Sequence, residues 1–139
     1  MEVLTKLKKE ILPQINDIPN INCGGCGIAA LAIAQWIRQA DQRYEPKYIV
    51  IWGKTNDNNV SIKKQKRLVD FPHIKVLYNN TSIDSEGTYK VSNDYYHLII
   101  DEQILIDTIC KSTWNPEFSR EHITDINHIV KFDINEKLK

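Results

Sequence analysis

The pattern of apolar and polar positions along this chain predicts helices at both ends and strands in between. Residues 2–12 carry an apolar stripe at helical spacing, and Pro13 is expected to kink or end that helix. A second helix is predicted over Cys26–Ala40, and its segment Ile28–Ala34 contains no polar residue. Because such a segment has no face that suits water, this helix is expected to be buried on most sides.

Runs of β-branched and aromatic residues predict strands. They cover Tyr48–Trp52, His73–Tyr78, Asp94–Ile100 and Ile104–Ile109. The polar stretch Asn79–Asn93 is expected to be a long loop or a broken hairpin. A weak amphipathic helix is predicted over Ile62–Asp70. The pair Asn115-Pro116 resembles a helix cap and first turn, so a last helix is expected to run to about Val130.

Composition and charge narrow the class of protein. The chain has 139 residues, which fits one domain over 1–139. Its 18 Lys and Arg balance 18 Asp and Glu, so the basic footprint of a nucleic-acid or membrane partner is missing. No signal-like apolar segment and no run of 18 apolar residues is seen, so a soluble, cytoplasmic protein is expected. Three cysteines is an odd number, so free thiols are expected.

The entry into the second predicted helix is the most chemically distinctive stretch. Cys26 follows Gly24 and Gly25 and precedes Gly27. Backbone N–H groups at a helix start are unpaired and carry partial positive charge, which favours the ionised, reactive form of a thiol. The glycines let the backbone turn sharply and let a substrate carbonyl approach. Cys26 is therefore a candidate nucleophile, although a cysteine here is also typical of a small buried apolar filler.

The last two predicted strands flank the short segment Asp101–Gln103. If they form a hairpin, Ile100 pairs with Ile104. Counting back along the ladder then places His97 directly opposite Asp107, with Cβ atoms about 4.5–5.5 Å apart. A carboxylate at that distance would fix the tautomer of the imidazole and stabilise its protonated form. His97 and Asp107 are therefore the candidate base and its orienting acid.

Plainer interpretations of the same residues stay open. His97 would also fit a half-buried core histidine, and Asp107 would also fit a residue that caps the end of a strand. The other histidines, His73, His122 and His128, are interpreted as structural or surface residues.

The order of these parts resembles the papain-like cysteine peptidase superfamily, in a minimal form close to its NlpC/P60-like and transglutaminase-like groups. The segment Cys23-Gly-Gly-Cys26-Gly-Ile-Ala-Ala is similar to the papain-type Cys-Gly-Ser-Cys-Trp-Ala, in which the second cysteine attacks. The resemblance implies Cys26 as nucleophile, His97 as general base and acid, and Asp107 as orienter. It also implies an α+β, papain-like fold, with the nucleophile helix packed on an antiparallel sheet.

The resemblance also implies where the oxyanion is bound. Long papain-type enzymes carry a glutamine six residues before the nucleophile, and that position is Asn20 here, with Asn22 nearby. Either amide is expected to donate to the oxyanion together with the backbone N–H of Cys26. Gly27 replaces the aromatic residue that follows the nucleophile in the family.

The implied activity is that of a cysteine peptidase or amidase that works through an acyl-enzyme, without a metal or other cofactor, on a peptide or protein substrate. Release of the acyl group to an amine would make the protein an acyltransferase instead. Cys23 and Cys26 also form a C-x-x-C, which fits a thiol redox protein, although residues 13–22 are a poor strand. A zinc site of Cys23, Cys26, Cys110 and one histidine, and a binding module without activity, are further alternatives.

Overall fold

The computed structural model describes residues 2–19, 21, 25–54, 73–92, 95–111 and 116–138. The helices are α1 (Glu2–Lys6), the π-helical η1 (Leu7–Ile11), α2 (Leu12–Asn16), α3 (Cys26–Ala40), α4 (Glu102–Lys111), α5 (Pro116–Val130) and α6 (Ile134–Lys137). The strands are β1 (Lys47–Lys54), β2 (His73–Tyr78), β3 (Thr81–Asp84), β4 (Gly87–Lys90) and β5 (Tyr95–Asp101).

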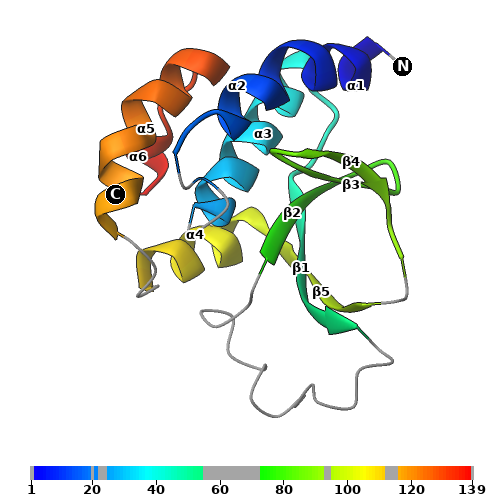
Figure 1. Ribbon diagram of the computed structural model, residues 1–139. Coiled ribbons are helices and arrows are strands. Elements are labelled where there is room, and N and C mark those ends of the chain that lie inside the picture. Colours follow the sequence, from blue (N-terminus) through cyan, green and yellow to red (C-terminus); the bar gives the residue numbers. More distant parts are fainter. Residues whose placement is uncertain are drawn as a thin grey trace.

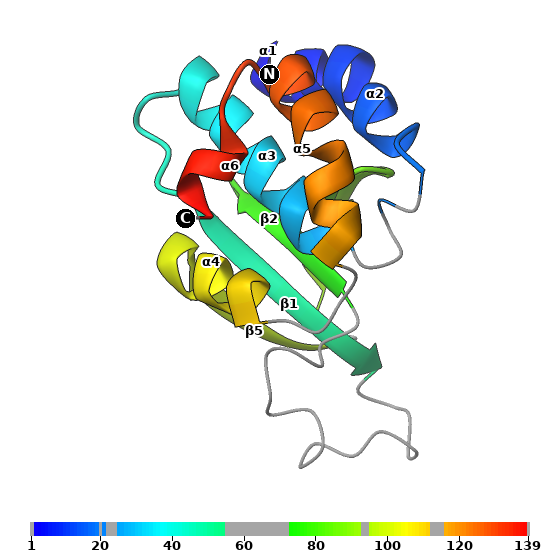
Figure 2. The same cartoon turned by 90° about the vertical axis from the view of Figure 1, so that its left-hand side faces the viewer.

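The five strands form one antiparallel sheet in the order β4-β3-β2-β1-β5. Helices gather on one face of this sheet (Figures 1 and 2). Side chains of β2 alternate between half-buried and buried positions, as expected of a strand with one face in the core. The architecture is therefore α+β, with helices packed on an antiparallel sheet, as the sequence predicts.

Helix α3 lies at the centre of the molecule. It packs against β2 and β3 on one side and against α5 on the other (Figure 2). Every residue from Cys26 to Gln35 is buried. This burial confirms the interpretation of the run Ile28–Ala34, because a helix covered by a sheet and by other helices needs no polar face.

The N-terminal helix continues further than expected. Helical structure runs through Pro13 to Asn16, and the π-helical turn η1 ends at Ile11, two residues before the proline. A proline inside an α-helix lacks an N–H and its ring crowds the carbonyl four residues earlier, so a wider turn relieves the conflict. Leu7, Ile11 and Ile15 of this bent helix are buried, and their burial favours its continuation past the proline.

Most other predicted elements are confirmed. The structure has α3 over Cys26–Ala40, β2 over His73–Tyr78 and α5 over Pro116–Val130, as predicted, and β1 contains the predicted strand Tyr48–Trp52. The helix predicted over Ile62–Asp70 lies outside the described residues.

The polar stretch after β2 is a pair of tight hairpins. Asn79 and Asn80 have φ angles of 48° and 61°, a left-handed conformation that asparagine tolerates and that suits a two-residue hairpin turn. The following turn joins β3 to β4, whose register pairs Asp84 with Gly87. The hairpin alternative for this stretch is thus confirmed.

The strand predicted over Ile104–Ile109 is wrong, because these residues belong to helix α4. Asp101 caps this helix: its carboxylate accepts a hydrogen bond from the backbone N–H of Ile104 at 2.9 Å. The buried residues Leu105 and Thr108 are three positions apart, which is helical spacing. The β-branched composition misled the prediction, and packing against α3 and β1 favours the helix.

Candidate active site

Cys26 is the first residue of α3, and its side chain is 6% exposed. The backbone N–H groups in the first turn of a helix have no acceptor within the helix. They therefore point out of its N-terminus, the end at which Cys26 lies. Gly27 keeps this turn free of side chains: a Cβ there would lie 3.1 Å from Cγ1 of Ile109 on α4 and 3.6 Å from Cδ1 of Ile74 on β2. This close approach explains why a large residue does not follow the cysteine.

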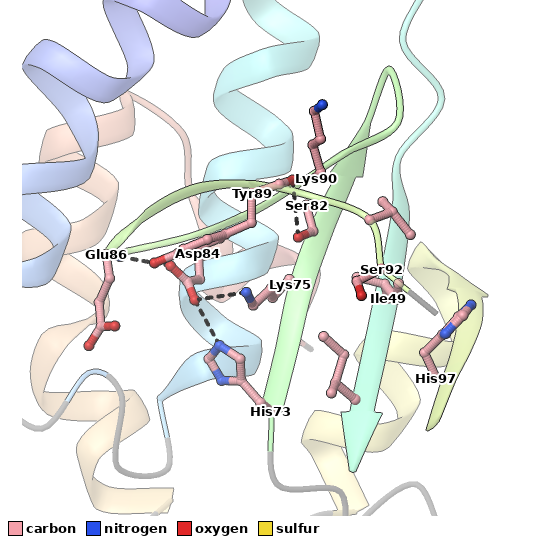
Figure 3. A pocket seen from close by; sticks show the side chains of 12 residues that line it. Ile49, His73, Lys75, Ser82, Asp84, Glu86, Tyr89, Lys90, Ser92 and His97 are labelled. Atoms are coloured by element: carbon pink, nitrogen blue, oxygen red, sulfur yellow. Dashed lines mark hydrogen bonds and ion pairs between the residues drawn. The ribbon is translucent and has the colours of Figure 1, made fainter. Parts of the chain in front are cut away.

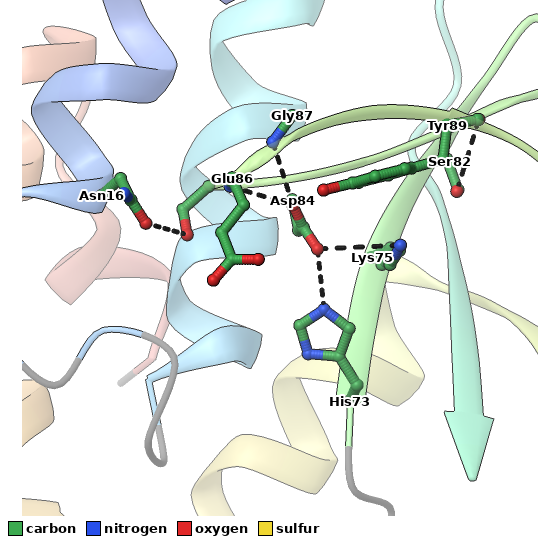
Figure 4. Close-up of polar contacts among 9 residues, drawn as sticks. Asn16, His73, Lys75, Ser82, Asp84, Glu86, Gly87 and Tyr89 are labelled. Carbon is green, nitrogen blue, oxygen red and sulfur yellow. Dashed lines mark hydrogen bonds and ion pairs between the residues drawn. The ribbon is translucent and has the colours of Figure 1, made fainter. Parts of the chain in front are cut away.

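His73, the first residue of β2, brings an imidazole to the thiol. Its Nε2 lies 2.9 Å from Oδ2 of Asp84 (Figure 4). A hydrogen bond to Cys26 is among the causes that raise the pKa of His73. Because Nε2 is occupied by the carboxylate, Nδ1 is the ring nitrogen left for the sulfur. The thiol, the imidazole and the carboxylate therefore form one hydrogen-bonded chain.

Asp84 is buried, with 7% of its surface exposed, at the end of β3. Its Oδ1 accepts the backbone N–H groups of Glu86 at 2.9 Å and Gly87 at 3.1 Å. Its Oδ2 faces His73, and Nζ of Lys75 lies 3.7 Å from the same oxygen. The turn after β3 thus holds one oxygen of the carboxylate and directs the other at the histidine (Figure 4).

The electrostatics of His73 and Asp84 favour an ion pair between their side chains. Hydrogen bonds to Asp84 and to Cys26 raise the pKa of His73 to about 9, although burial opposes this. Burial alone would raise the pKa of Asp84. The hydrogen bond from His73, the charge of Lys75 and the N–H of Glu86 outweigh burial and lower it. At neutral pH the imidazole is therefore protonated and the carboxylate is ionised.

The site borders a cavity of about 460 Å³ on the sheet face opposite α3 (Figure 3). Ile49 and Ile51 of β1 line it, together with Lys75 and Tyr89. A cavity of this size fits a small molecule or a few residues of a peptide. Because His73 also lines it, a bound group would lie beside the imidazole.

Of the site residues predicted from the sequence, Cys26 is the one that the structure places beside His73 and Asp84. His97 lies on β5, where its register partner is Ile51 of β1, and Ile51 pairs with His73 on its other side. Two strand spacings amount to about 10 Å, so His97 lines the same cavity at the far side of β1 (Figure 3).

The predicted pairing of His97 with Asp107 on a hairpin is wrong, because α4 replaces the second strand. Asp107 lies on the exposed side of that helix and accepts a hydrogen bond from the side chain of Gln103 at 3.0 Å. The predicted oxyanion donors, Asn20 and Asn22, lie outside the described residues.

Sequence reasoning missed His73 and Asp84. His73 opens a strand that the sequence predicts, and Asp84 lies three residues before Gly87 in a stretch where a hairpin was one of the expectations. Both residues follow the order that the resemblance implies, since the histidine lies on one strand and the acid on the next. The signal available for these two residues was the order of histidine and acid on successive strands.

The described residues were also searched for free thiols, metal-binding groups and membrane-spanning helices. Cys26 and Cys110 are free thiols, and among the residues with described structure no group of three or more metal-binding side chains comes together. No helix in the described part of the chain has the length and apolar character needed to cross a membrane.

The chain was compared with family models, curated proteins and solved structures, and none of them matches it. Evidence for a function therefore comes from the geometry of Cys26, His73 and Asp84.

Proposed function

We propose that this protein is a cysteine-dependent hydrolase, a peptidase or amidase, in which Cys26 is the nucleophile, His73 the general base and acid, and Asp84 the orienting acid. The observation that carries the proposal is the 2.9 Å contact of His73 with the buried Asp84, in an imidazole whose pKa is raised by Asp84 and by Cys26. Nucleophile, base and orienter in hydrogen-bond reach of one another are the signature of covalent catalysis.

In the proposed reaction the Cys26 thiolate attacks the carbonyl carbon of an amide, and a C–S bond forms. The protonated imidazole of His73 gives its proton to the leaving nitrogen as the C–N bond breaks. Water then attacks the acyl-enzyme, His73 takes a proton from it, and the C–S bond breaks to regenerate the thiolate. Asp84 holds the imidazole in position and stabilises its positive charge throughout.

The resemblance to papain-like enzymes supports the same proposal with a corrected pair of residues. A thiol at the start of a buried helix is followed by a histidine on one strand and an acid on the neighbouring strand. A transglutaminase-like acyltransferase would use the same acyl-enzyme, with an amine in place of water.

The alternative of a thioredoxin-like redox protein has less support. That fold requires a strand directly before the C-x-x-C motif. In this chain the helix α2 and a turn at Ile18 precede the motif. A hydrogen-bonded histidine and carboxylate beside Cys26 would also have no role in it.

The first test compares His73→Ala with His97→Ala, which removes the histidine that the sequence pattern favours. Iodoacetamide is reacted with each protein between pH 5 and pH 9, and mass spectrometry locates the modified thiols. Cys26 is expected to react well below pH 8 in the wild type and in His97→Ala, and to lose that reactivity in His73→Ala. The exposed Cys110 is the internal reference, because it lies on α4 outside the chain of hydrogen bonds.

An activated ester tests the acyl step itself. With p-nitrophenyl acetate, a burst of p-nitrophenol and an acetyl group on Cys26 are expected, and Cys26→Ala should show neither. If Cys26 reacts as Cys110 does at every pH and forms no acetyl adduct, the proposed function is wrong and a binding role takes its place.

A further inference from the structure

Lys75 is a second cation, besides His73, that lies next to the carboxylate of Asp84. Its Nζ lies 3.7 Å from Oδ2, the oxygen that also faces His73 at 2.9 Å, and its side chain is only 15% exposed. The same Nζ lies 3.8 Å from the ring centroid of Tyr89. The ammonium group is thus held between a carboxylate and an aromatic face (Figure 4).

We propose that Lys75, held against the ring of Tyr89, is a positioning residue that keeps Asp84 ionised and directed at His73. This inference rests on the proposed function, since its role is to orient the imidazole that serves Cys26. Lys75 acts through Asp84 and takes no part in the bond changes.

The carboxylate of Asp84 is surrounded by donors and cations. Two backbone N–H groups occupy Oδ1 of Asp84, while His73 and Lys75 share Oδ2. An ionised carboxylate accepts about four such contacts, so this one is fully paired. A buried carboxylate that loses its cationic partner is strongly destabilised.

His73 is a partner that changes charge during the proposed reaction, because it gives its proton to the leaving group. At that moment Asp84 would face a neutral imidazole. Lys75 keeps its charge through this step, so the carboxylate stays ionised and is ready to stabilise the imidazolium when it forms again.

Tyr89 explains how a flexible lysine is kept in place. It lies on β4 opposite Ser82 of β3, while Lys75 lies on β2, so the ring reaches across the sheet to the ammonium group. An ammonium group over an aromatic face gains about 0.5–1 kcal/mol when exposed and more when desolvated. The contact limits the directions that Nζ can take and leaves it beside Asp84.

The titratable and charged groups around this cluster come from several elements. They are Cys26 of α3, His73 of β2, Glu86 of the turn after β3, Tyr89 and Lys90 of β4, and His97 of β5. Lys90 is exposed and lines the same cavity, which makes it the matched control for Lys75.

The experiment compares Lys75→Met, Lys75→Arg and Lys90→Met with the wild type. Two pH titrations are measured: the rate of Cys26 alkylation by iodoacetamide, and the ¹³C chemical shift of the Asp84 carboxyl carbon. In Lys75→Met both the acid limb of alkylation and the Asp84 midpoint should move up by about 0.5–1 pH unit. Lys75→Arg, which keeps a charge that also stacks on aromatic rings, and Lys90→Met should match the wild type.

Two variants of the ring test its part independently of the charge. Tyr89→Phe keeps the aromatic face and should titrate as the wild type does, whereas Tyr89→Leu should shift both titrations in the direction of Lys75→Met by a smaller amount. A role confined to stability would lower the unfolding temperature of Lys75→Met without moving either midpoint.

Separate outcomes overturn the two proposals. If the wild-type profile depends on His73 but Lys75→Met leaves both titrations unchanged, or if Lys90→Met shifts them equally, the positioning role is wrong and the proposed function stands. If wild-type Cys26 shows no reactivity that depends on His73, the proposed function is wrong, and the positioning role is wrong with it.

Discussion

Two carboxylates occupy separate polar clusters along α3, and their partners differ. Glu102 accepts hydrogen bonds from Gln35 of α3 and from the hydroxyl of Tyr48 at 3.2 Å, and Lys137 lies 2.6 Å from its other oxygen. These residues join α3, β1, α4 and α6. Asp84, near the first turn of α3, is paired with an imidazole that also faces a thiol.

The difference lies in what each cluster can do when pH or substrate changes. Burial, followed by the charge of Glu102, raises the pKa of Tyr48 beyond the physiological range, so its hydroxyl stays neutral. Lys137 is an ammonium group and Gln35 never ionises. The Glu102 cluster therefore serves stability, while the Asp84 cluster contains a group that can exchange a proton next to the thiol of Cys26.

The largest expected effect is a loss of stability when Glu102 is replaced. Glu102→Ala removes the acceptor shared by Gln35, Tyr48 and Lys137 and leaves their polar groups partly buried. A loss of about 3 kcal/mol in the free energy of unfolding is expected, measured by urea titration. Cys26 alkylation should keep its wild-type pH profile, and a shifted profile would show that the two clusters are coupled.

The second effect is the pH dependence of stability from His73. Its pKa is raised from 6.5 to about 9 by folding, so its contribution is fully present below about pH 6.5 and is lost as pH rises toward 9. After allowance for its partial exposure, the loss is on the order of 2 kcal/mol. Urea unfolding of the wild type and of His73→Ala at pH 6 and pH 9 isolates the effect, which should be absent from the variant.

The third effect separates the charge of Asp84 from its shape. Asp84→Asn keeps an oxygen for the N–H groups of Glu86 and Gly87 but removes the negative charge beside His73. Alkylation of Cys26 at pH 6 should fall about tenfold, because the imidazolium of His73 beside the sulfur loses the charge that stabilises it, and one pKa unit is a tenfold change. An unchanged rate would mean that the carboxylate only supports the turn.

The smallest effect is expected at Asp107. It lies on the exposed side of α4 and is contacted by Gln103 four residues earlier. Asp107→Asn should change the unfolding free energy by less than about 0.5 kcal/mol and leave the alkylation profile unchanged. Loss of Cys26 reactivity in this variant would restore the pairing first predicted from the sequence.

Local patterns predicted the elements whose surroundings follow from their own residues. The apolar run Ile28–Ala34 required burial wherever the chain placed it, and the glycines around Cys26 marked the turn that opens α3. The strand at His73–Tyr78 and the helix that begins at Pro116 carried equally local signals. The strand predicted after Asp101 was wrong. β-branched residues favour strands, but the N-cap Asp101 and the packing of Leu105 favoured a helix.

Strand order was the information that no local pattern contained. Periodicity shows which side of a strand a residue faces, but not which strand becomes its neighbour. The residues that adjoin Cys26 in the sequence were therefore enough to make it the candidate nucleophile. Its partners, His73 and Asp84, were decided by the placement of β2 and β3 against α3, because a hydrogen-bonded chain between distant segments exists only once the sheet is assembled.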